Sequence, residues 1–228
     1  MAKNFFPSLP AIKDTVKRGL PRASLGALLA AGTVATGAPV LAEQMPVQDR
    51  PVAAQAQAAQ QGVAKVTASE LIRVAEQEVG VSEDASGGGT PYHAWYMSSQ
   101  RAKETVARDG GDISAYANAP WCDMFVSWVG EKTGMRATVG WDAYTVTHAK
   151  WFKDNGRWGE EPRPGAVVFF AWGGGDSIDE IDHVGLVKSD NGDGTITTIE
   201  GNTGNGKVEK RVRPVSEVVG YGYPEYAS

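Results

Sequence analysis

Apolar residues between positions 67 and 154 recur every three or four residues, which is the helical period. This pattern predicts three helices, over residues 67–80, 121–131 and 142–154. The first begins with a T-x-x-E capping box formed by Thr67 and Glu70, and the third with Asp142 as its cap. Residues 95–106 carry a weaker helical pattern.

The pattern changes to that of strands after residue 165. Short apolar or alternating runs, separated by turn residues, predict five strands over residues 166–172, 183–188, 195–200, 207–213 and 218–223. Helices followed by a series of strands indicate an α+β domain, in which N-terminal helices pack on an antiparallel sheet of about five strands.

The N-terminal segment has neither pattern. A stretch with five basic residues precedes an apolar run over residues 25–41. The sequence V-L-A closes this segment at Ala42. This order is typical of a secretory signal peptide over residues 1–42. A membrane anchor is the alternative, but the run is short for a span and is broken by Pro39.

Residues 43–66 are rich in Gln and Ala and are predicted to form a flexible linker, followed by one folded domain over residues 67–228. The predicted signal holds five of the 22 basic and one of the 27 acidic residues, so the remaining chain has a net charge of about −9. An acidic surface argues against nucleic acid and anionic lipid as partners. We expect an exported monomer with no stable membrane association.

The chain has one cysteine, Cys122, so it forms no internal disulfide and no cysteine-based zinc site. Such a residue is a reactive thiol, a link to another chain or a buried bystander. Cys122 falls in the first turn of a predicted helix, where backbone N–H groups and the helix dipole favour a thiolate. The same amides can hold the oxyanion of an attacked carbonyl. Cys122 is therefore the candidate nucleophile, with core packing as the alternative.

Three histidines are candidate partners for the thiol. His93 is predicted to lie in a surface loop, and His148 on the apolar side of a helix suits a structural role. His183 begins a strand, and a turn at Asn191-Gly192 would place Glu200 directly opposite it, in reach of the imidazole. Asn202 would point to the same side if the backbone stays extended. A turn two residues later would separate His183 from Glu200. The alternative interpretation of the two residues is an ordinary cross-strand pair on a solvated face.

Four blocks of sequence, in this order, resemble the CHAP family of cysteine- and histidine-dependent amidohydrolases and peptidases. They are A-P-W-C-D-M-F-V-S-W-V at residues 119–129, P-G-A-V-V-F-F at 164–170, D-H-V-G-L-V at 182–187 and I-E-G-N-T at 199–203. The resemblance covers residues 67–223. It implies a papain-like fold with the nucleophile at a helix start, and Cys122 as nucleophile, His183 as base, Glu200 as orienting acid and Asn202 in support.

The resemblance also implies a substrate and a place. Members cleave peptidoglycan, as endopeptidases or as N-acetylmuramoyl-L-alanine amidases, so we expect a secreted, extracellular hydrolase associated with the cell wall. Two alternatives remain: a non-catalytic wall-binding module on the same fold, and an amidase for another substrate. Many members carry a separate wall-binding module, and we expect none here.

No cofactor or metal is expected. Some family members bind calcium near the nucleophile, and Asp109, Asp112 and Asp123 lie near Cys122 in the sequence. The segment 190–194 looks superficially like a calcium loop but lacks the distal Glu, so a hairpin turn is the simpler interpretation. The acidic loop that precedes His183 is expected to form a solvated rim; it holds Asp176, Asp179, Glu180 and Asp182. The aromatic faces of Trp121 and Trp172 are expected to bind substrate, with Trp141 a further candidate.

Overall fold

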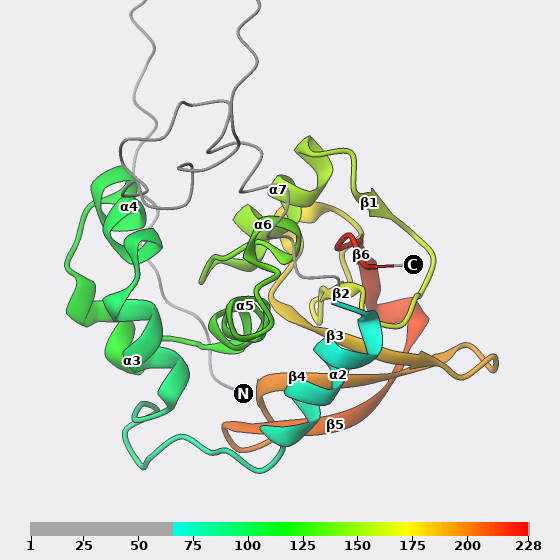
Figure 1. Cartoon of the computed structure of the whole chain (residues 1–228), viewed down its shortest axis with the longest axis horizontal. Helices are drawn as coiled ribbons and strands as arrows, with labels where there is room; N and C mark the ends of the chain where they lie inside the picture. Colours follow the sequence, from blue (N-terminus) through cyan, green and yellow to red (C-terminus); the bar gives the residue numbers. More distant parts are fainter. Residues whose placement is uncertain (1–65, 228) are drawn as a thin grey trace, which may run out of the picture. The chain divides into compact units, whose positions relative to one another are not determined.

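A computed structural model describes residues 66–227. The predicted signal peptide, and the predicted linker apart from Val66, lie outside the described residues. Helices occupy the first half of the described part and an antiparallel sheet the second half (Figure 1), which confirms the predicted α+β class. The arrangement is consistent with a papain-like fold.

The helices precede the sheet in the chain. The α-helices are α2 (Ala68–Gln77), α3 (Pro91–Ser98), α4 (Gln100–Asp109), α5 (Cys122–Lys132), α6 (Arg136–Val139) and α7 (Thr145–Asp154), and the 3-10 helices are η2 (Ile113–Asn118), η3 (Ile178–Glu180) and η4 (Val215–Glu217). The capping box of α2 is confirmed, because Glu70 N donates to Thr67 Oγ1 and Thr67 N donates to Glu70 Oε2. Helix α5 confirms the helix predicted over residues 121–131 to within a residue.

The weak pattern over residues 95–106 corresponds to two helices, α3 and α4. Ser99 ends α3 and caps α4, accepting a hydrogen bond from Ala102 N. Helix α3 begins at Pro91, which needs no amide partner at a first helical position. The predicted loop around His93 is therefore wrong.

Helix α7 begins two residues later than predicted. Its N-cap is Tyr144, which is 44% exposed. The Asp142 carboxylate accepts hydrogen bonds from the backbone of Ala143 and Tyr144, so it caps the turn that precedes the helix.

The sheet contains six strands within the described residues, all antiparallel, in the order β1-β6-β2-β3-β4-β5. They are β1 (Trp158–Gly159), β2 (Val167–Phe170), β3 (His183–Asp190), β4 (Thr195–Thr203), β5 (Lys207–Pro214) and β6 (Val218–Gly222). The five predicted strands are confirmed. Strand β1 was missed because two residues are too short to show a period.

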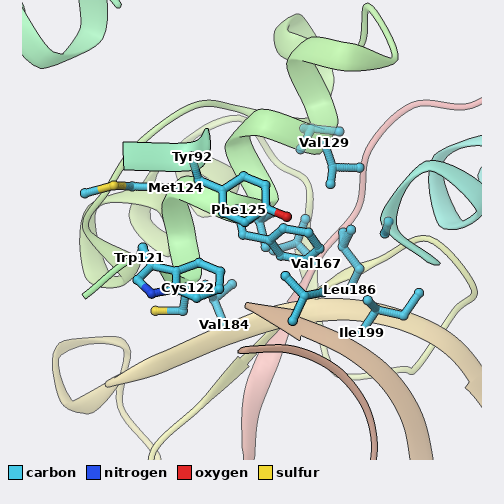
Figure 2. Packing of buried hydrophobic residues seen from close by; sticks show 14 of the residues in the cluster. Tyr92, Trp121, Cys122, Met124, Phe125, Val129, Val167, Val184, Leu186 and Ile199 are labelled. Atoms are coloured by element: carbon cyan, nitrogen blue, oxygen red, sulfur yellow. The ribbon is translucent and has the colours of Figure 1, made fainter. Parts of the chain in front are cut away.

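The main core lies between helix α5 and strands β3 and β4. Nearly every residue of α5 is buried, which explains why its sequence is apolar on more than one face. Figure 2 shows Phe125 and Val129 of this helix in one cluster with Leu186 and Ile199 of the two strands. The packing fixes the start of α5 against the sheet. None of the helices within residues 66–227 has both the length and the apolar character to cross a bilayer.

Gly201 of β4 allows this close contact between strand and helix. A Cβ atom at this position would lie 2.6 Å from Phe125 Cβ and 2.9 Å from the Trp121 ring. We expect Gly201→Ala to lower the free energy of unfolding by about 1–3 kcal/mol, because α5 must move away from the sheet. Urea unfolding measures the change. Gly173→Ala, where a Cβ meets nothing within 4 Å, is the control, and an equal loss of stability in both variants would contradict the packing argument.

Candidate active site

Cys122 is the first residue of α5 and is 6% exposed. The N-cap, Trp121, makes no side-chain hydrogen bond to the helix start, so no capping side chain competes for the amides of the first turn. Backbone hydrogen bonds from Asp123 and Val184 reach the thiol. Val184 follows His183 in β3, and Figure 2 shows it beside Cys122. The fold therefore brings the thiol to the start of the histidine strand.

The surroundings of Cys122 disfavour ionisation of its thiol. Burial raises its pKa to about 12, and the neighbouring charge of Asp123 acts in the same direction. The backbone N–H groups lower the pKa, as the helix start predicted, but they are outweighed. The expected resting thiolate is therefore corrected: a base must remove the proton.

His183 begins β3 and is also buried, with 6% exposure. Its Nε2 lies 2.9 Å from Glu200 Oε2. An ionised carboxylate only accepts hydrogen bonds, so Nε2 carries the hydrogen and Nδ1 of the neutral ring has the lone pair. This tautomer leaves Nδ1 to take a proton.

Glu200 lies in β4 and is fully buried. Besides His183, it accepts hydrogen bonds from Thr198 Oγ1 at 2.5 Å and from two nitrogens of Arg213, Nε at 2.9 Å and Nη2 at 2.6 Å. Burial opposes ionisation, but hydrogen bonds from Arg213, His183 and Thr198 outweigh it and hold the pKa of Glu200 at about 2. Glu200 is a permanent carboxylate at neutral pH.

The predicted register between β3 and β4 is wrong by three residues next to the turn and, beyond a bulge between Val187 and Ser189, by two residues near His183. Leu186 pairs with Ile199, so Gly185 and not His183 lies opposite Glu200. The connecting loop spans residues 191–194, which includes both turns considered from the sequence. A shift of two residues keeps each side chain on its face, so His183 and Glu200 still meet, diagonally. Gly185 makes room for this, because a Cβ there would lie 2.7 Å from Glu200 Cγ.

Asn202 departs from the extended geometry that its predicted role assumed. Its φ is +50°, and the pairing of β4 with β5 shifts between Glu200 and Thr203. Among the described residues, no hydrogen bond joins the Asn202 amide to His183 or Glu200. The support that it would give to the catalytic residues stays a prediction from the resemblance.

The two tryptophans expected to bind substrate differ in position. Trp121 is fully buried, stacks on Tyr92 and donates from Nε1 to Glu83, so the expected contact with substrate is corrected: it is a core residue. Trp172 is 42% exposed and its ring lies 5.4 Å from that of His183, so it can form a wall beside the histidine.

Arg213 of β5 was not found from the sequence. It holds both oxygens of Glu200, and its guanidinium lies 4.6 Å from the ring centroid of Trp172. The Arg213 side chain thus connects the Glu200 carboxylate to the exposed ring of Trp172. An arginine on an alternating strand is usually solvated, and nothing in the local pattern distinguishes this one.

The other two histidines are both buried. His148 contacts Asp123 and the carbonyl oxygen of Val139, as expected for a structural residue. His93 is 2% exposed, and its ring contacts Thr90 Oγ1 and the carbonyl oxygen of Ala119. The predicted surface position of His93 is therefore wrong; the residue holds the segment that leads into α5.

The acidic segments have structural partners of their own. In the hairpin loop, Asp190 accepts from Gly192 N and Asp193 accepts from Thr195 N, as in an ordinary turn. The acidic residues before His183 are exposed, as predicted, and Asp182 accepts from Trp172 N. Within residues 66–227, no three or more His, Cys, Asp or Glu side chains are grouped as metal ligands would be.

Residues 114–202 match the family model of the CHAP domain, and no curated protein matches the chain significantly. The matched segment contains α5 and strands β2 and β3, and it ends in β4 just after Glu200. This segment is therefore similar to the CHAP domain, the family that the four sequence blocks resemble.

Proposed function

We propose that the protein is an exported cysteine hydrolase that cleaves amide bonds in peptidoglycan, with Cys122 as nucleophile, His183 as base and Glu200 as the orienting acid. The CHAP domain indicates peptidoglycan-related hydrolase or amidase activity in general. The observation that supports the residue roles is the 2.9 Å contact between His183 Nε2 and a buried, ionised Glu200. This contact favours the tautomer with the hydrogen on Nε2, which leaves Nδ1 available to act as a base.

The reaction begins with proton transfer. Nδ1 of His183 takes the proton of the Cys122 thiol as the sulfur attacks the amide carbonyl carbon. The carbonyl oxygen becomes an oxyanion, which the backbone N–H groups at the start of α5 can hold. Glu200 stabilises the imidazolium that forms.

The intermediate then collapses. The C–N bond breaks as His183 returns the proton to the leaving amine, which leaves a thioester on Cys122. His183 next takes a proton from water, the hydroxide attacks the thioester, and the thiol recovers its proton as the carboxylic acid product leaves. Trp172 lies beside this path and offers an exposed aromatic face to the sugar or peptide.

Digestion of purified peptidoglycan tests the proposal. We expect soluble fragments whose mass spectra show new amino termini within peptides, for an endopeptidase, or free lactyl groups on the glycan, for an N-acetylmuramoyl-L-alanine amidase. Protein whose thiol has been alkylated with iodoacetamide is the control. Binding without cleavage, together with an unreactive thiol, would refute the proposal and identify a non-catalytic wall-binding module.

A further inference from the structure

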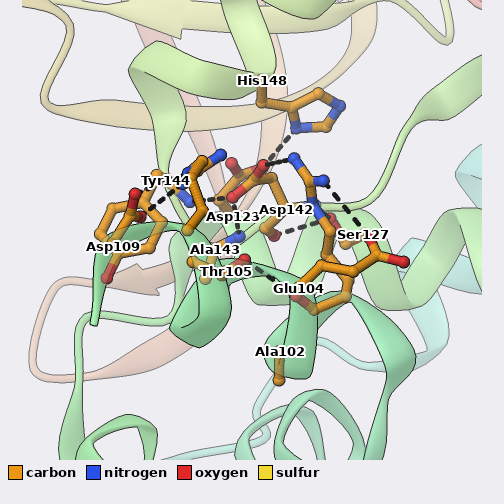
Figure 3. Close-up of polar contacts among 12 residues, drawn as sticks. Ala102, Glu104, Thr105, Asp109, Asp123, Ser127, Asp142, Ala143, Tyr144 and His148 are labelled. Carbon is orange, nitrogen blue, oxygen red and sulfur yellow. Dashed lines mark hydrogen bonds and ion pairs between the residues drawn. The ribbon is translucent and has the colours of Figure 1, made fainter. Parts of the chain in front are cut away.

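A second histidine–carboxylate pair lies directly behind the proposed nucleophile. Asp123 is the residue after Cys122, and its Oδ1 is 2.7 Å from Nδ1 of His148 in α7. The two side chains are 0% and 1% exposed. Figure 3 shows the His148 ring joined to Asp123, with Asp142 beside them. The proton transfer proposed above uses neither residue of this pair.

The contacts of His148 require a bound proton. Its Nε2 lies 2.6 Å from the carbonyl oxygen of Val139, which only accepts, so Nε2 carries a hydrogen. Nδ1 faces a carboxylate at 2.7 Å, and a second proton must lie between them. The pair is then an imidazolium with a carboxylate, or a neutral ring with a carboxylic acid. Its net charge is zero in either form.

The charged surroundings are balanced only while this proton is present. Asp142 is neutralised by Arg101, at 2.5 Å, and Arg101 also lies 3.6 Å from the exposed Glu104. Arg136 lines a cavity of about 230 Å³ beside His148, but it pairs with Glu131. The aromatic rings packed on His148, which carry no charge, are Trp151, Phe152 and Phe169. Without the proton, Asp123 would be an uncompensated anion.

Such an anion would act directly on the thiol. Asp123 Oδ2 is buried and has no hydrogen-bond partner within the described residues, so His148 is the main counter-charge of Asp123, with a smaller contribution from Arg101. Burial works against a charged ring, but the Asp123 carboxylate and its hydrogen bond outweigh this effect and raise the pKa of His148. The pair therefore holds its proton more firmly than a free imidazole does.

We propose that His148 is a positioning residue for the nucleophile: by holding a proton with Asp123 behind the start of α5, it removes a negative charge that would oppose formation of the Cys122 thiolate. The inference rests on the proposed function in treating Cys122 as the nucleophile. A purely structural pair would tie α5 to α7 without affecting how the thiol responds to pH.

The rate of alkylation of Cys122 by iodoacetamide, measured from pH 5 to pH 10, separates these roles. In His148→Gln, Asp123 has no partner and is protonated at low pH, where the variant and wild type should react alike. Above the pH at which Asp123 ionises, the variant should react about tenfold more slowly, since a nearby like charge raises a pKa by about one unit. Adding Asp123→Asn should restore the wild-type profile.

A purely structural role of His148 predicts different alkylation profiles. A change in rate that is independent of pH, or a double variant that reacts no faster than His148→Gln, would overturn the inference. His93→Gln is a matched control, because His93 is equally buried but contacts no carboxylate; its profile should keep the wild-type shape.

Two further outcomes are decisive. If His148→Gln does not fold, ¹⁵N spectroscopy of the wild-type ring and ¹³C spectroscopy of the Asp123 carboxyl at pH 8 replace it. A neutral ring beside an ionised carboxylate would refute the proposal, and any state with the shared proton supports it. Alkylation requires no peptidoglycan, so a protein that shows the expected profiles without cutting peptidoglycan refutes the proposed function and not this inference.

Discussion

Replacing Cys122 by alanine is expected to slow the release of peptidoglycan fragments by about four to six orders of magnitude, which is the range seen when a hydrolase loses its nucleophile. Alanine has no lone pair to attack the carbonyl, and neither His183 nor the amides of α5 can substitute for it. Mass spectrometry measures the release of fragments over several hours. Wild-type protein, diluted until its rate of release matches that of the variant, calibrates the comparison.

Loss of folding must be separated from loss of chemistry. Cys122 is buried but small, and removing its sulfur leaves the aromatic packing around Trp121 and Phe125 in place. Cys122→Ala should therefore unfold near the wild-type urea concentration and still bind peptidoglycan. Undiminished release by this folded variant would refute the assignment of Cys122.

The periodic spacing of apolar residues predicted most of the fold because it shows directly which side chains are buried. The apolar positions of α5 and of the five longer strands follow from which faces pack on the core. His183 and Glu200 were brought together correctly although the register was wrong, because the bulge between Val187 and Ser189 leaves an offset of two residues near His183. A two-residue slip exchanges neighbours along a strand and leaves the faces unchanged.

The errors arose where contacts depend on distant parts of the chain. Trp121 stands next to the nucleophile, but Tyr92 and Glu83 bury it, and neither is near it in sequence. Arg213 reaches Glu200 from a strand position paired with Ile196, four residues away along β4. No local pattern encodes such a reach. The extended backbone assumed at Asn202 was wrong for a different reason: asparagine tolerates a positive φ.

Replacing Glu200 by glutamine is expected to lower kcat/KM by about two to four orders of magnitude. The carboxylate accepts from His183, Thr198 and twice from Arg213, whereas an amide has only one oxygen and presents N–H donors to the rest. A donor facing His183 Nε2 would select the opposite tautomer, in which Nδ1 carries a hydrogen and accepts no proton. Steady-state hydrolysis of isolated peptidoglycan fragments measures the loss.

The same substitution leaves Arg213 without its counter-ion. Breaking a buried ion pair by removing one partner costs about 3–5 kcal/mol, so the variant should be less stable than wild type at pH 6. Glu209→Gln on β5 is the control, because Glu209 pairs with Arg211 at a partly exposed site and its loss should cost about 1 kcal/mol or less. Wild-type kcat/KM in a folded Glu200→Gln protein would contradict the role of Glu200.

The stability difference between wild type and Glu200→Gln should also depend on pH. The pKa of Glu200 is about 2 in the folded protein against an ordinary value of 4.5, so its ionisation stabilises the fold above pH 4.5 and is lost as pH falls toward 2. The shift corresponds to about 3 kcal/mol. Urea unfolding at pH 6 and at pH 2.5 should therefore show the two proteins approaching each other in acid. A difference that stays constant would mean that Glu200 is not held as a carboxylate by Arg213 and His183, and the tautomer on which the proposed base depends would lose its support.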